Sequence, residues 1–109
     1  MNIEDFKQFV ADHTIEMSRI EQERMALMGL GGEVGELTDM MKKVYFYNKE
    51  LDREHLVEEI GDVLHYVMSF LNATGVSVDE IIDSNVKKIS TRYHTKVSRE
   101  EALERADKK

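Results

Sequence analysis

The sequence contains no cysteine and no proline, and these absences restrict both the chemistry and the fold. Without cysteine, disulfides, zinc–thiolate sites and thiol catalysis are excluded. Because no proline interrupts the helical patterns that run through most of the chain, we predict an all-α fold. No apolar run approaches the length of a transmembrane helix, so no membrane partner is expected. The N-terminus lacks the basic and apolar regions of a secretory signal, so we expect a cytoplasmic protein.

Acidic residues outnumber basic ones by 22 to 15, which gives a formal net charge of −7. So acidic a chain is a poor candidate for binding nucleic acid through its phosphates, and no nucleic-acid partner is expected. The acidity can serve solubility alone, or some carboxylates can be gathered to bind cations. The positions of the acidic residues decide between these two interpretations.

The length of 109 residues, with no low-complexity linker, predicts a single domain over residues 1–109. A chain this short buries only a modest core, because the buried share of the surface grows with chain size. Pairing with a copy of itself would add buried surface, so we expect a homo-oligomer.

Apolar residues at three- and four-residue spacing predict four helices. Their expected ranges are 3–18, 22–46, 54–73 and 77–93. Asp52 fits the N-cap of the third helix, and Gly75 suits the left-handed residue that ends it. Ser77 and Glu80 fit a capping box that opens the fourth helix, and a second box beginning at Ser98 predicts a short C-terminal helix.

Two acid pairs share one form, in which an apolar residue and a glycine separate two acids: Glu33 with Glu36, and Glu59 with Asp62. Residues three apart lie on one helix face, so each pair projects two carboxylates from adjacent turns. Four such charges between packed helices would repel one another, and divalent cations would remove that cost. Acid pairs are common on solvated helix faces, but two matched pairs inside apolar helices favour a metal site. Oxygen ligands alone suit Mg²⁺ or Mn²⁺.

This pattern resembles the MazG-like all-α nucleoside triphosphate pyrophosphohydrolase superfamily. The signature of that family is E-E-x-x-E, a spacer and E-x-x-D. It falls here on Glu33, Glu36, Glu59 and Asp62, with Gly32 in place of the first acid.

The resemblance covers about residues 20–105 and implies a four-helix MazG-like bundle that forms a homodimer or homotetramer. It implies hydrolysis of a nucleoside triphosphate to its monophosphate and pyrophosphate, with Mg²⁺ or alternatively Mn²⁺ as the cofactor. The four acids would hold cations that neutralise the triphosphate, align it and activate water for in-line attack. The preferred base and sugar, and the phosphorus attacked, stay open.

Five further residues are expected to bind the substrate: Lys43, Tyr66, Asn85, Lys88 and Arg92. Lys43 would contact phosphate, although a lysine near a helix C-terminus also favours the helix dipole. Tyr66 resembles the aromatic residue beside the nucleobase pocket of the family; the alternative is a core tyrosine. Asn85, Lys88 and Arg92 form a polar stripe that would contact phosphate and base, or else face solvent.

Two acids near the pairs are open to more than one interpretation. Glu58 and Asp39 could support the metal site or act as a general base, although solvent exposure is more common for such residues. The segment 29–32 is rich in glycine but lacks the lysine of a phosphate loop. We expect it to bend or break the second helix just before the site.

The sequence also leaves alternatives to the enzyme. Asp62 followed by His65 hints at a di-iron bundle, but such bundles need two acid–histidine pairs, and Glu36 is followed by Asp39. A non-catalytic helical module that binds metal or nucleotide is the main alternative function. A purely structural helical dimer is the third.

Overall fold

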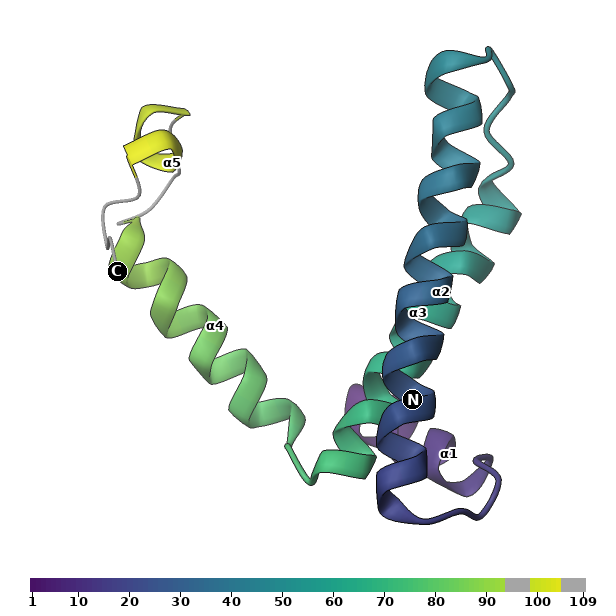
Figure 1. Cartoon of the computed structure of the whole chain (residues 1–109). Coiled ribbons are helices and arrows are strands. Elements are labelled where there is room, and N and C mark those ends of the chain that lie inside the picture. The colour runs from purple at the N-terminus through teal and green to yellow at the C-terminus, as the bar shows by residue number, and fades with distance from the viewer. Residues whose placement is uncertain (94–98, 105–109) are drawn as a thin grey trace. The chain divides into compact units, whose positions relative to one another are not determined.

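The computed structural model describes residues 1–93 and 99–104, and all regular elements in this part of the chain are helices (Figure 1). The helices are α1 (Ile3–Asp12), α2 (Arg19–Phe46), α3 (Arg53–Thr74), α4 (Val78–Arg92) and α5 (Arg99–Glu104). The predicted all-α class is therefore confirmed. None of the described helices combines the length and the apolarity that a membrane span requires.

The chain divides into two compact units, Met1–Gly75 with α1 to α3 and Val76–Lys109 with α4 and α5. In the first unit, α2 and α3 lie side by side as an antiparallel pair (Figure 1). The short connection between α2 and α3 keeps the two helices adjacent, as in other helical hairpins. The shorter α1 packs on α3.

The buried residues of the first unit gather mainly where α1 meets the start of α2 and the end of α3. Val10, Ala26 and Met68 are almost fully buried there. Two polar contacts fasten the same region. The Arg19 guanidinium donates to the Ala73 carbonyl at 2.7 Å, and the Asn72 amide donates to the Lys7 carbonyl at 3.0 Å.

Local capping signals set most of the helix ends as predicted. The Asp52 carboxylate accepts a hydrogen bond from the backbone N–H of His55, and Gly75 adopts the left-handed conformation with φ of 75°. Ser77 and Glu80 form both hydrogen bonds of a capping box. The capping residue predicted at Ser98 lies outside the described residues, and α5 begins at Arg99.

Two predictions about helix ends and continuity are wrong. The first helix ends at Asp12 rather than near residue 18. The second helix begins three residues earlier than expected, because Ser18 forms a capping box with Glu21. The glycine-rich segment 29–32 does not break α2, which is continuous from Arg19 to Phe46. Packing against α3 outweighs the low helix propensity of these glycines.

The apolar stripe of α2, which we expected to be buried, is partly open to solvent. Leu27 is 56% exposed and Val34 is 45% exposed. On α3, Ile60 is 50% exposed. The neighbouring helices α1 and α3 do not cover every side of the 28-residue α2, so these apolar side chains stay exposed on the first unit.

Candidate metal centre

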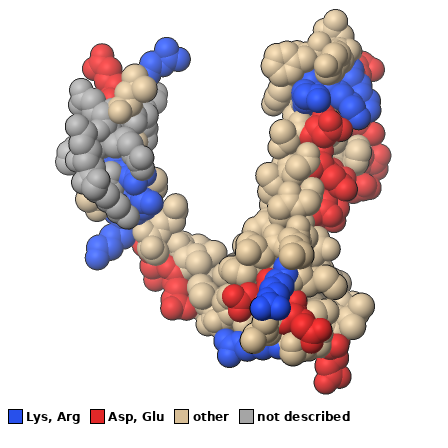
Figure 2. Space-filling view, viewed as in Figure 1, with Lys and Arg blue, Asp and Glu red and all other residues tan. Residues whose placement is uncertain are grey.

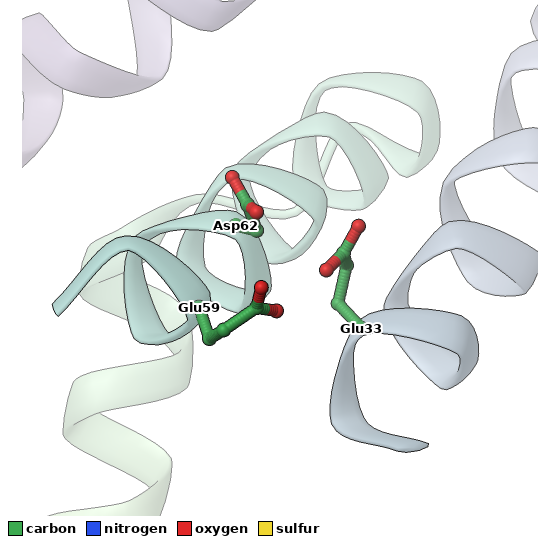
Figure 3. A group of neighbouring side chains, drawn as sticks. All are labelled: Glu33, Glu59 and Asp62. Atoms are coloured by element: carbon green, nitrogen blue, oxygen red, sulfur yellow. The ribbon is translucent and has the colours of Figure 1, made fainter. Parts of the chain in front are cut away.

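Three carboxylates meet where α2 lies beside α3. Glu33 extends from α2 toward Glu59 and Asp62 of α3 (Figure 3). One carboxylate oxygen from each residue lies within 4.8 Å of the other two. The three-residue spacing of Glu59 and Asp62 places both on the same face of α3. The structure thus brings together three of the four predicted ligands.

The electrostatics of this cluster is unfavourable in the chain alone. Burial raises the pKa of Glu33, and the negative charges of Glu36, Asp62 and Glu59 raise it further. The Oε2 atoms of Glu33 and Glu59 are buried and have no hydrogen-bond partner among the described residues. Buried carboxylate oxygens without partners carry a desolvation cost that a bound cation would offset. These three acids could therefore hold a divalent cation, and their all-oxygen donor set suits a hard one.

Glu36 is not among the three clustered carboxylates. It lies one turn beyond Glu33 on the exposed side of α2 and lines a pocket of about 450 Å³ that Glu59 also lines. Its proximity is sufficient to raise the pKa of Glu33. The fourth predicted ligand therefore faces the pocket beside the cluster.

The pocket lies between α2, the connection 47–52 and the start of α3. Its lining residues are Gly32, Gly35, Glu36, Asp39, Met40, Lys43, Lys49, His55 and Glu59. A Cβ atom at Gly32 or Gly35 would have no neighbour within 4 Å. These two glycines therefore leave their part of the pocket lining without side chains.

Basic residues stand beside the acids at one end of the α2–α3 pair (Figure 2). Lys43 lines the pocket and forms an ion pair with Asp39 at 3.2 Å. Lys49 also lines the pocket and was not predicted. Asn48 has a positive φ of 54°, which turns the chain back so that the Lys49 backbone N–H donates to the Lys43 carbonyl at 3.2 Å. A left-handed asparagine after a helix is the sequence signal that could have indicated this reversal.

The pocket also contains His55, a second residue that the sequence analysis missed. Its ring lies one turn before Glu59 on α3 and hydrogen-bonds to that carboxylate. The i,i+4 spacing is visible in the sequence, but it is common on solvated helix surfaces.

Tyr66 is half-buried one turn after Asp62 on α3, and its ring lies directly against the backbone of α2 at Gly29. A Cβ atom at Gly29 would overlap the ring, so only glycine permits this approach. The adjacent His65 packs edge-on against the Tyr66 ring, with centroids 5.4 Å apart. His65 is not part of the carboxylate cluster.

The remaining predicted substrate residues lie on α4, in the second unit. Asn85 lines a shallow pocket with Ile81, Ile82 and Val86. Lys88 is exposed and Arg92 is half-buried. Their contact with a substrate stays a prediction.

Comparison with known proteins identifies the class to which this site belongs. Residues 21–97 match the family model of the MazG nucleotide pyrophosphohydrolase domain. The chain therefore belongs to the MazG family, as the sequence motifs predicted.

The chain is also similar to Gene 37 protein of Mycobacterium phage L5. The two are 32% identical over 69 residues, which cover 60% of this chain and 60% of the phage protein. The chain thus matches less than two thirds of the length of this curated relative. No solved structure matches the chain.

Proposed function

We propose that this MazG-family protein is a Mg²⁺-dependent nucleoside triphosphate pyrophosphohydrolase that acts in nucleotide-pool clearance. The reaction converts a nucleoside or deoxynucleoside triphosphate and water to the monophosphate and pyrophosphate. The observation that carries this proposal is the meeting of Glu33, Glu59 and Asp62. Two of these acids have a buried oxygen with no hydrogen-bond partner in the described part of the chain. Membership of the MazG family supports the same reaction class.

In this proposal Glu33, Glu59 and Asp62 hold the cation, and Glu36 contributes from the pocket side. Mg²⁺ is the expected ion, with Mn²⁺ as an alternative, because all donors are carboxylate oxygens. A bound divalent cation would supply the positive charge that a triphosphate requires at an acidic site. The acids are brought together by the packing of α2 on α3, so the ligand set is assembled before a cation binds.

The pocket beside the cluster is suited to the phosphate groups of the substrate. Lys43 and Lys49 bring two ammonium groups to a pocket that already contains Glu36 and Glu59. Lys49 makes no ion pair within the described part of the chain, so its charge is available for an anion. We propose that these lysines contact phosphate oxygens, for which ammonium groups are common partners.

The nucleoside would lie away from the lysines. Tyr66, whose ring lies against Gly29, would offer an aromatic ring for the base. Asn85, Lys88 and Arg92 of α4 are also proposed to bind the substrate. The family match continues from α2 through α4, which supports one functional domain over residues 1–109.

We further propose that the protein assembles as a cytoplasmic homodimer or homotetramer in a MazG-like four-helix arrangement. The exposed apolar side chains of Leu27, Val34 and Ile60 support this assembly, since a second copy could cover them. Neither nucleic acid nor membrane is proposed as a partner.

A panel of canonical and modified nucleotides, scored for pyrophosphate release with Mg²⁺ and with Mn²⁺, tests the proposed reaction. The wild type should release pyrophosphate from at least one nucleotide, and Glu36→Gln and Asp62→Asn should abolish that release. Nucleotide-dependent thermal stabilisation without any turnover would contradict the enzyme and favour a non-catalytic module that binds nucleotide. Absence of both turnover and stabilisation would contradict nucleotide binding altogether.

A further inference from the structure

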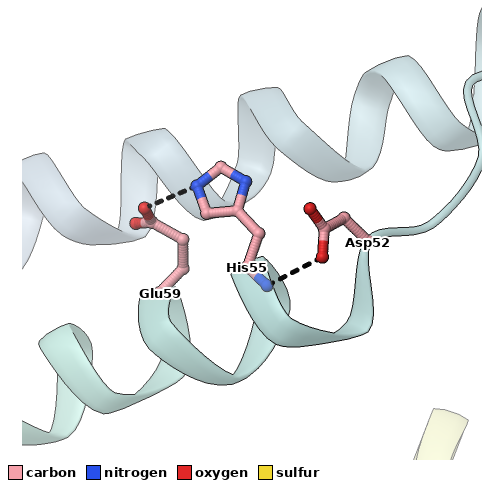
Figure 4. Close-up of polar contacts among 3 residues, drawn as sticks. All are labelled: Asp52, His55 and Glu59. Carbon is pink, nitrogen blue, oxygen red and sulfur yellow. Dashed lines mark hydrogen bonds and ion pairs between the residues drawn. The ribbon is translucent and has the colours of Figure 1, made fainter.

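His55 contacts the metal centre from outside. Its Nε2–H donates to Oε1 of Glu59 at 3.1 Å (Figure 4). The other oxygen of the same carboxylate, Oε2, is buried and has no hydrogen-bond partner among the described residues. The two oxygens of Glu59 are therefore in different environments: one is held by a histidine of this chain, and the other is left without a protein donor.

A comparison with another pair of the same spacing shows why this contact differs from an ordinary surface interaction. Lys43 and Asp39 also lie four residues apart, but both side chains are about half exposed, at 49% and 56%. In the His55–Glu59 pair the histidine is likewise 49% exposed, but the carboxylate side chain is only 13% exposed. Exposed pairs contribute little because water replaces them at little cost, whereas water has poor access to the Glu59 carboxylate. The histidine donor therefore contacts a carboxylate that is largely shielded from water.

The backbone of His55 is fixed as well. His55 is the third residue of α3, and its N–H donates at 3.1 Å to the carboxylate of the N-cap residue Asp52 (Figure 4). The first turn of a helix otherwise frays, because its N–H groups have no partners within the helix. The cap holds the histidine backbone, and the histidine ring holds Glu59 one turn further along.

We propose that His55 is a positioning residue of the metal centre, which holds Glu59 by one oxygen so that the other is presented to the cation. The inference rests on the metal site of the proposed function. Hydrogen-bond partners of metal ligands orient those ligands, and their loss typically lowers metal affinity or activity by about 10–100-fold. His55 acts through Glu59 rather than on the substrate, so its effect is present before any nucleotide binds.

Two substitutions separate the hydrogen bond from the packing of the ring. His55→Phe keeps an aromatic ring of similar size and removes the donor. His55→Gln removes the ring and keeps an N–H donor that can contact a carboxylate four residues away. His13→Leu serves as the matched control, because it removes an exposed histidine at the C-cap of α1, where the ring stacks on Phe9 and bonds to the Phe9 carbonyl.

The measurement is the Kd of Mn²⁺ in the absence of nucleotide, from the signal of the free ion in electron paramagnetic resonance titrations of the purified full-length chain. We expect Kd to increase about 10–100-fold in His55→Phe. We expect a value close to that of the wild type in His55→Gln and in His13→Leu. Thermal unfolding in chelator should be similar for all four proteins, which separates positioning from a loss of fold.

Equal Kd values for the wild type and His55→Phe would overturn the inference, even if turnover fell, because His55 would then act on the substrate. A Kd that increases in His55→Gln and not in His55→Phe would overturn it too, since ring packing rather than donation would be responsible. Failure of the wild type to bind Mn²⁺ is a distinguishable result, which would overturn the metal centre itself.

Discussion

Glutamates in two parts of this molecule have opposite electrostatic environments. In the capping boxes, the Glu21 and Glu80 carboxylates accept hydrogen bonds from the backbone N–H groups of Ser18 and Ser77, at 3.2 Å and 2.8 Å. Hydrogen bonding to the capping serine lowers the pKa of both acids. At Glu21 the side chain of Ser18 contributes most, and at Glu80 the backbone of Ser77 contributes most. At the centre of the α2–α3 pair, burial and neighbouring acids raise the pKa of Glu33 instead.

The difference shows which carboxylates the chain satisfies by itself. A capping box is complete within one helix turn, because each polar group of the pair finds its partner there. The carboxylate cluster is incomplete, because its members face one another and two of their buried oxygens have no hydrogen-bond partner among the described residues. A cation would complete the cluster as the serine residues complete the caps. Substitutions in the two regions should therefore have different consequences.

The largest difference is expected in turnover. Glu59→Gln should reduce pyrophosphate release by about 100-fold or more, since loss of a ligand should exceed the effect of losing a partner of a ligand. Glu21→Gln should leave turnover unchanged, because glutamine also serves in a capping box. Steady-state assays of the two variants at saturating Mg²⁺ make the comparison. Equal losses in both would show that the cluster has no special part in catalysis.

A smaller effect, on stability alone, is expected when a cap is removed. Ser18→Ala should lower the free energy of unfolding by about 1 kcal/mol, because the first turn of α2 loses its side-chain acceptor. Urea denaturation should report this loss equally with Mg²⁺ and with chelator. A loss that appeared only with Mg²⁺ would mean that the cap and the metal centre affect stability together. The two regions would then not be independent.

The smallest effect concerns how the stability of the fold changes with pH in the presence of chelator. The acids of the two regions should change it in opposite directions. The pKa of Glu33 is raised in the folded protein, so the wild type should lose stability relative to Glu33→Gln as the pH rises through that pKa. The pKa of Glu21 is lowered, so the wild type should be more stable than Glu21→Gln above the ordinary glutamate range. That advantage should disappear as the pH falls through the lowered pKa. Melting temperatures across a pH series test both signs, and two profiles of the same sign would contradict the account.

The fold was predictable from sequence wherever a local signal determined it. Asp52, Gly75 and Ser77 act within one turn of their own positions, and all three end or begin a helix as expected. Ser18 carries the same signal, but the apolar pattern before it suggested that the first helix continued to that point. The end of α1 depends on how the following residues pack, and sequence spacing does not report that packing.

The candidate site was predictable in part for a similar reason. The spacing of Glu59 and Asp62 fixes their common face, and the helical hairpin then brings Glu33 to them. The position of Lys49 in the pocket depends on the chain reversal at Asn48, and the spacing of apolar residues gives no sign of that reversal. His55 could be paired with Glu59 from spacing alone, but only the burial of that carboxylate distinguishes the pair from a surface interaction.

The central claim is that the carboxylate cluster destabilises the chain alone and stabilises it when a cation is bound. Thermal unfolding of the wild type and Glu33→Gln, each with chelator and with saturating Mg²⁺, tests it most directly. In chelator the variant should melt at the higher temperature, because one charge of the mutually repelling cluster has been removed. With Mg²⁺ at about 100 times its Kd the wild type should gain about 2.7 kcal/mol and become the more stable protein. A variant that melts higher at every Mg²⁺ concentration would contradict the claim and favour a purely structural helical protein.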